Sequence, residues 1–288
     1  MSELIQNLVN LMNLETIEHN LFRGQSQDIG GRSVFGGQVV SQALVAAART
    51  LEEDRHTHSL HAYFLRPGDM KAPIVYEVDR IRDGGSFTTR RVVAVQHGEA
   101  IFSMSCSFQT FEEGLQHQAA AMPEVPAPDD VEPEIEIRKR LAPKIPKRFR
   151  ETFTQERPIE IRPINPVDFF EPEARPPRKQ VWFRTNGSIG DSQPLHQALL
   201  AYASDFGLLG TGMMPHQLSF VDPSVQAASL DHAIWFHHPF RVDEWLLYDM
   251  ESPSASNARS FNRGLIYSRN GELVASVAQE GLMRVRKK

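Results

Sequence analysis

The sequence predicts an α+β protein made of two similar units, each with one helix and a long antiparallel sheet. A helical stretch of small apolar residues that begins with Gln-Ala-Leu occurs twice, in SQALVAAART at 41–50 and in HQALLAYASD at 196–205. Strand-like runs follow each stretch. From His61 to Gln109 there are 48 residues, and from His232 to Gln279 there are 47. Such a repeat indicates a duplicated structural unit.

The strands of each half can be read in order. The first half has HAYFLRP, PIVYEVDRI, SFTTRRVVAVQ, a turn at His-Gly-Glu and AIFSMSCSFQ; the second has HAIWFHHPF, EWLLYDMES, RSFNRGLIYS and ELVASVAQ. Asn270-Gly271 between the last two runs predicts a hairpin with a type I′ turn, because both turn residues then have positive φ. A helix of small residues with a sheet closed around it is the layout of a hotdog fold, so we expect a double hotdog.

Proline content sets the predicted boundaries. Between Pro123 and Pro177 lie 12 of the 19 prolines, among runs of charge, and such a stretch cannot supply long central strands. We therefore predict a first repeat at 1–113, a connector at 114–157 and a second repeat at 158–288. The basic stretch RKRLAPKIPKRFR within the connector favours a solvated linker helix over a phosphate site.

Composition limits the functional classes. A net charge of -5 gives no general attraction to polyanions, so we expect no nucleic-acid partner and no anionic-membrane binding. Cys106 is the single cysteine, which excludes an internal disulfide and a thiolate zinc site; we expect it to be buried. The first residues, MSELIQNLVNLMNLE, do not resemble a signal peptide, no apolar run is long enough to span a membrane, and the last residues are not a peroxisomal signal. We expect a reducing cytoplasm.

The sequence closely resembles the acyl-CoA thioesterase II family, the double-hotdog acyl-CoA hydrolases, over almost its whole length. The matching stretches are LFRGQS, VFGGQVVSQAL, HSLHAYFLRPGD, DGGSFTTRRVVAVQ, RKQVWFRTNG, HQALLAYASD, SLDHAIWFHHPF, EWLLY and LVASVAQEGLMR. The proline-rich connector matches least. The resemblance implies hydrolysis of fatty acyl-CoA to fatty acid and CoA.

The resemblance also implies a catalytic set of Asp205, Ser229 and Gln279, with serine where some relatives have threonine. In a helix, Ala198, Ala201 and Asp205 share one face, which puts the carboxylate at the end of an apolar stripe. An aspartate can accept a proton from water, while a hydroxyl and an amide can hold that water by hydrogen bonds. We therefore expect direct attack by water without a covalent intermediate.

The first repeat carries Thr50 where the second carries Asp205. Aligning the histidines and glutamines of the two halves also places Ser59 near Ser229 and Gln109 on Gln279. This alignment predicts that the first repeat keeps water-positioning groups but lacks the base, so that each chain has one active site.

Substrate contacts are predicted from two further features. Gly36, Gly37 and Gln38 precede or begin a predicted helix, where backbone amides can bind an oxyanion or a phosphate, although the glycines can equally serve a turn or close packing. Three arginines, Arg66, Arg90 and Arg91, are candidates for the CoA phosphates, and ordinary exposed arginines are equally common.

Other functional classes stay open at this point. No Gly-x-Ser-x-Gly motif supports a serine hydrolase, and the histidines lack metal-site spacing, so we expect neither a metal nor another cofactor. A hotdog enoyl-CoA hydratase would need an Asp–His pair, with His232 or His196 as candidates. A silent acyl-CoA-binding protein is the non-enzymatic alternative. We expect a homodimer or homotetramer.

Overall fold

All strands of the described chain, residues 2–52 and 54–286, belong to one 13-stranded antiparallel sheet in the computed structural model. The strand order is β1-β2-β4-β5-β6-β3-β10-β13-β12-β11-β8-β7, with β9 paired to β13. Strands β3 and β10 pair at the centre, with Leu60 opposite Ile234, so one half of the sheet comes from each predicted repeat. The double-hotdog arrangement is confirmed.

The first half of the sheet comes from the N-terminal part of the chain. Its elements are α1 (Glu3–Met12), β1 (Glu15–Glu18), β2 (Leu21–Gly24), α2 (Gly36–Ala48), β3 (His56–Phe64), β4 (Ile74–Asp83), β5 (Phe87–Gln96) and β6 (Glu99–Gln109). Alternating side chains of β6, among them Met104, Cys106 and Phe108, are buried against the helices. Burial raises the pKa of the Cys106 thiol to about 12, as expected for an inert structural cysteine.

The second half repeats this arrangement. Its elements are β7 (Ile159–Pro163), β8 (Arg178–Thr185), α5 (Gln193–Ser204), α6 (Leu208–Thr211), η3 (Met214–His216), β9 (Val225–Ser229), β10 (Asp231–Phe236), β11 (Leu246–Ser256), β12 (Arg259–Ser268) and β13 (Leu273–Val285). Strand β13 is long enough to pair with β10 in its first part and with β9 in its second part.

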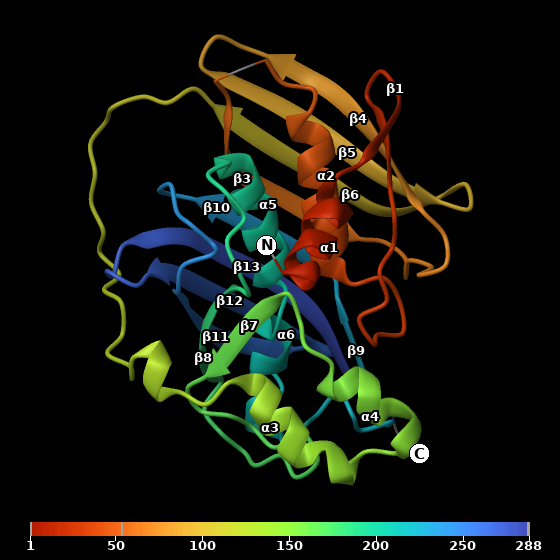
Figure 1. The fold of residues 1–288 in the computed structure, drawn as a ribbon, viewed down its shortest axis with the longest axis vertical. Helices are drawn as coiled ribbons and strands as arrows, with labels where there is room; N and C mark the ends of the chain where they lie inside the picture. Colours follow the sequence, from red (N-terminus) through yellow and green to blue (C-terminus); the bar gives the residue numbers. More distant parts are fainter. Residues whose placement is uncertain (1, 53, 287–288) are drawn as a thin grey trace.

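Helices α2 and α5 lie side by side and pack on the same face of the sheet (Figure 1). Their small residues permit the close approach: Ala43, Ala47, Ala198 and Ala201 are all fully buried. The Ser41 hydroxyl donates to the Ala198 carbonyl across the contact at 2.6 Å. The helix pair is therefore the centre of the core and joins the two units.

The turns differ in part from the expectation. At 97–98, His97 and Gly98 both have positive φ, as a two-residue turn between β5 and β6 requires. At the predicted Asn270-Gly271 hairpin only Gly271 has positive φ, so the hairpin is present but its turn is not type I′. Asn257 and Ala258 adopt positive φ between β11 and β12, where the residue types gave little indication.

The connector is more structured than a solvated linker. It forms η1 (Pro128–Asp130), α3 (Glu134–Leu141), η2 (Ala142–Lys144) and α4 (Lys147–Thr154), at the lower end of the molecule in Figure 1. Prolines 143 and 146 lie between the two α-helices, and Ile137 of α3 is buried. The basic stretch is thus divided between two short helices, and α3 packs against the second unit.

Candidate active site

Asp205 lies where the two units meet. It is the residue that ends α5, and its Oδ2 accepts a hydrogen bond of 2.9 Å from the backbone N–H of Gly37 in the first turn of α2. The residue before α2, Phe35, makes no side-chain cap. A carboxylate is disfavoured at the carbonyl end of its own helix and favoured at the amide end of another. The N-terminus of α2 therefore stabilises the charge of Asp205.

Two glycines make this contact possible. A Cβ atom on Gly36 would lie 2.7 Å from Asp205 Oδ2, and one on Gly37 would lie 2.4 Å from the carbonyl oxygen of Tyr202. Both distances are shorter than van der Waals contact. The glycines thus allow the backbone of α2 to approach the end of α5, as the close-packing alternative requires. The Gly37 amide serves Asp205.

Gln279 supports the other carboxylate oxygen. Its Nε2 donates to Asp205 Oδ1 at 2.7 Å, and only 1% of the residue is exposed. Ser229 pairs with Gly281 across β9 and β13, and directly paired residues share a face of the sheet. Gly281 lies two residues after Gln279, so Ser229 and Gln279 project from the same face. The Ser229 hydroxyl has no hydrogen-bond partner among the residues that the structure describes.

A histidine lies behind the amide. His232 is completely buried, with Nδ1 3.2 Å from Gln279 Nε2 and Nε2 2.8 Å from Ser204 Oγ. The sequence indicated His232 as a candidate for the alternative hydratase reaction. The alternation of buried Ile234 and Phe236 in β10 is the signal that puts His232 on the inner face. Because the Gln279 amide bonds both Asp205 and His232, these two do not form the direct pair that a hydratase would need.

The corresponding end of α2 has different chemistry. The Thr50 hydroxyl accepts from Arg90 Nε at 2.8 Å, and the Arg90 guanidinium pairs with Asp83 at 2.5 Å. Arg90 is 1% exposed, so it holds the end of α2 inside the first unit and cannot reach a CoA phosphate at the surface. At this end of the helix pair Thr50 occupies the position that Asp205 has in α5, and the nearby carboxylate of Asp83 is paired with Arg90.

The predicted register between the repeats was wrong. In β6, Phe108 points inward and Gln109 therefore outward, whereas Gln279 of β13 points inward. Likewise His61 is exposed on the outer face while His232 is buried. A bulge between Thr57 and Ser59 adds a further shift. Ser59 and Gln109 consequently do not frame a second water site.

The remaining predicted contacts divide into buried and exposed groups. Gln38 is 1% exposed; its Nε2 donates to the Gln25 carbonyl and its Oε1 accepts from the Gln27 amide, so it acts within the fold. Arg66 and Arg91 are about half exposed and pair with Glu99 and Asp79, respectively.

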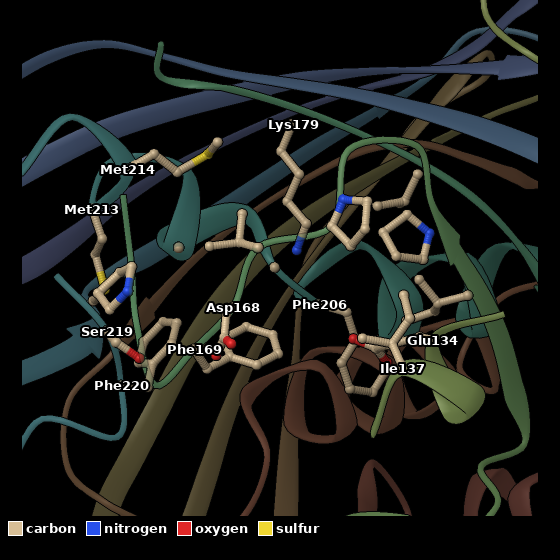
Figure 2. A pocket seen from close by; sticks show the side chains of 18 of the residues that line it. Glu134, Ile137, Asp168, Phe169, Lys179, Phe206, Met213, Met214, Ser219 and Phe220 are labelled. Atoms are coloured by element: carbon tan, nitrogen blue, oxygen red, sulfur yellow. The ribbon is translucent and has the colours of Figure 1, made fainter. Parts of the chain in front are cut away.

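A pocket of about 320 Å³ lies beside the end of α5, within the range of ligand pockets. Figure 2 shows aromatic and aliphatic side chains around the amine of Lys179. The walls come from the second unit and the connector, and include Ile137, Phe169, Val181, Phe183, Phe206, Gly207, Met213, Met214 and Phe220. Burial lowers the pKa of Lys179, with Glu134 and Arg138 acting in opposite directions. The pocket is thus mainly apolar.

The described residues also bear on metal binding and on membrane insertion. No group of three or more His, Cys, Asp or Glu side chains in this part of the chain is arranged to hold a metal ion. No helix within the described ranges is long and apolar enough to cross a membrane.

Comparisons with known proteins define the class to which this fold belongs. Residues 149–282 match the family model described as acyl-CoA thioesterase, and residues 24–109 match the acyl-CoA thioesterase N-terminal domain. Acyl-CoA thioesterase 2 of Haemophilus influenzae is 43% identical over 99% of both chains. Acyl-coenzyme A thioesterase 8 of Mus musculus is 43% identical over 97% of this chain and 89% of its own.

Solved structures agree. The acyl-CoA thioesterase II of Mycobacterium marinum is 43% identical, with a TM-score of 0.77 over 96% of this chain and 98% of that chain. A hot dog fold protein of Alicyclobacillus acidocaldarius, 20% identical, has a TM-score of 0.79 over the full length of both chains and supports the fold alone. The chain belongs to the acyl-CoA thioesterase family and is an acyl-CoA thioester hydrolase.

The close approach at Gly36 generates a prediction. If Asp205 takes part in the reaction, Gly36→Ala should lower kcat on the order of 100-fold, because a Cβ 2.7 Å from Oδ2 displaces the carboxylate and a misplacement of about 1 Å can have an effect of this size. The control is Gly85→Ala, since a Cβ at Gly85 meets nothing within 4 Å. Rates of CoA release from both variants, with thermal melts to check folding, make the comparison. Equal rates for Gly36→Ala and the wild type would contradict the geometry described.

Proposed function

We propose that Asp205 is the general base that activates water for attack on the thioester carbonyl of a fatty acyl-CoA. Water loses a proton to the carboxylate, its oxygen bonds to the carbonyl carbon, the C–S bond breaks, and the thiolate of CoA takes up a proton. The products are a fatty acid and CoA. The proposal rests on the Asp205 carboxylate, which accepts hydrogen bonds from the Gly37 N–H and from the Gln279 amide at the place where the two units meet.

Gln279 and Ser229 are proposed as the groups that orient the base and the water. Gln279 fixes the carboxylate through Oδ1. The Ser229 hydroxyl, without a partner among the described residues, is able both to donate to water and to accept from it. Since Thr50 replaces the base at the other end of the helix pair, we propose one active site per chain.

The pocket beside α5 is our proposed site for the acyl chain. Phe206 and Gly207, which line it, follow Asp205 directly in the chain. For the CoA phosphates we favour Arg66, since it lies two residues from Phe64, whose ring lies 3.0 Å from where a Cβ on Gly36 would be. Arg91 is the less favoured candidate because its neighbour Arg90 points into the core, so Arg91 projects from the outer face of β5.

Assembly and location are proposed on separate observations. Tyr63 and Trp235 lie on the outer face of the central strands and are 63% and 38% exposed. An exposed apolar area on β3 and β10, where the two similar units pair, suits a symmetric contact with a second copy of the chain. We therefore propose a homo-oligomer. The unpaired, buried Cys106 fits a reducing compartment, for which we propose the cytoplasm.

Removing the base tests the proposed function. Asp205→Asn should keep the fold and lose about 100- to 10,000-fold in kcat, as expected when a positioned general base is removed. Asp79→Asn, which changes an exposed aspartate paired with Arg91, is the matched control and should stay near the wild-type rate. Thiol release from acyl-CoA measures both. Turnover by Asp205→Asn at the wild-type rate would disprove the assignment.

Ser229 distinguishes attack by water from acylation of the enzyme. Ser229→Thr should stay active, whereas Ser229→Ala should lose roughly tenfold, about the value of one neutral hydrogen bond. The protein mass measured during turnover should show no acyl adduct. An adduct on the wild type that is absent from Ser229→Ala would establish a covalent route instead.

The acyl pocket predicts a change of chain-length preference. Met214→Trp should fill part of the pocket and lower kcat/KM for the longest accepted acyl chain about tenfold or more, the effect of roughly one excluded methylene, with little change for short chains. Leu115→Trp, at a fully exposed position, is the control. A rate profile over acyl lengths that is identical for both variants would place the acyl chain elsewhere.

A further inference from the structure

The hydrogen bonds behind Asp205 form a chain from β13 to α5. Gln279 Nε2 lies 2.7 Å from Asp205 Oδ1 and 3.2 Å from His232 Nδ1. On the other side of the ring, His232 Nε2 lies 2.8 Å from Ser204 Oγ. The Ser204 hydroxyl donates to the Ala201 carbonyl at 3.0 Å, which uses its single hydrogen.

These distances determine the proton positions. The amide nitrogen of Gln279 has two hydrogens and no acceptor, so it donates both to Asp205 and to His232. His232 Nδ1 must then be unprotonated, and the ring carries its hydrogen on Nε2, which donates to Ser204 Oγ. If the amide were reversed, its Oε1 would face the carboxylate oxygen at 2.7 Å, and two acceptors would oppose each other.

We propose that His232 is a positioning residue: as the neutral Nε2–H tautomer it accepts from the Gln279 amide and keeps that amide turned to donate to Asp205. This inference rests on the proposed role of Asp205 as the base. His232 touches neither substrate nor water in this account and acts entirely through Gln279.

Protonation of His232 would disrupt this arrangement. A hydrogen on Nδ1 would face the hydrogens of the Gln279 amide, and the amide would have to turn its oxygen toward the ring. Asp205 would then lose its donor. Turnover should therefore decrease as the pH falls and His232 becomes charged.

The surroundings keep the ring neutral at neutral pH. Burial lowers the pKa of His232, and the Asp205 carboxylate raises it. The other groups that face it, Ser204 of α5, Gln279 of β13 and Ala62 opposite on β3, carry no charge. Tyr248 of β11 donates to the Ser204 carbonyl, and burial raises the pKa of its phenol well above the usual value, so it stays neutral too.

Two substitutions distinguish the role of His232 as a hydrogen-bond acceptor from the effect of its protonation. Asn at 232 can put its Oδ1 near the position of Nδ1 and accept from Gln279 without taking up a proton. His232→Asn should keep kcat within about threefold at neutral pH and lose less activity on acidification than the wild type. His232→Leu offers no acceptor and should lose about 10- to 100-fold in kcat with little change in KM. His237→Asn, at an exposed histidine bonded to Ser276, is the control and should leave the pH profile unchanged.

An NMR measurement on the wild-type protein needs no variant to fold. The nitrogen shifts of His232 at neutral pH should identify the Nε2–H tautomer. A hydrogen on Nδ1, an acid limb that is the same in folded His232→Asn as in the wild type, or wild-type kcat in His232→Leu would overturn the proposal. If Asp205→Asn is inactive, any of these outcomes overturns the role of His232 and leaves the proposed function intact. An active Asp205→Asn would instead disprove the proposed function itself.

Discussion

The hydrogen bond from Gly37 N–H to Asp205 is the contact on which the arrangement of this protein depends. A carboxylate at the carbonyl end of α5 is unfavourable within its own unit and becomes favourable at the amide end of α2. Gly36 and Gly37 let the backbone of α2 come close to Asp205, and the small buried residues of both helices let α2 and α5 pack against each other. The pairing of β3 with β10 fixes the two units in this position.

The same contact explains why the two ends of the helix pair differ. An inward carboxylate needs donors, and at the end of α5 it has Gly37 and Gln279. At the end of α2 the chain has Thr50 with the buried Arg90, whose charge is paired by Asp83. The end of α5 thus carries an anion, the Asp205 carboxylate that we propose as the base. The end of α2 carries a cation, Arg90, whose hydrogen bonds are made within the fold. Two similar units allow this difference, because the first unit can supply the helix N-terminus that the Asp205 carboxylate of the second unit needs.

The sequence was sufficient for much of the architecture and for the family, and it indicated the inward carboxylate of Asp205. Alternation located the strands, Asp205 fell on the inner face of a helix, and family resemblance indicated its partners. Register was less predictable, because strand side chains alternate with a period of two and a slip of one residue reverses the face. The bulge near Ser59 and the outward Gln109 are such cases. Arg90 resembled its exposed neighbour Arg91, and only the packing of the end of α2 distinguishes them.

The most direct test of the central claim is a crystal structure of the Asp205→Asn protein with an uncleaved acyl-CoA. If Asp205 is the base, the thioester carbonyl carbon lies within about 4 Å of the side chain at 205, which is the reach of one bridging water. It then lies near Gly37 and Gln279, and the Thr50 end of the helix pair is empty. A thioester bound at the Thr50 end, or one far from both ends of the helix pair, would contradict the central claim.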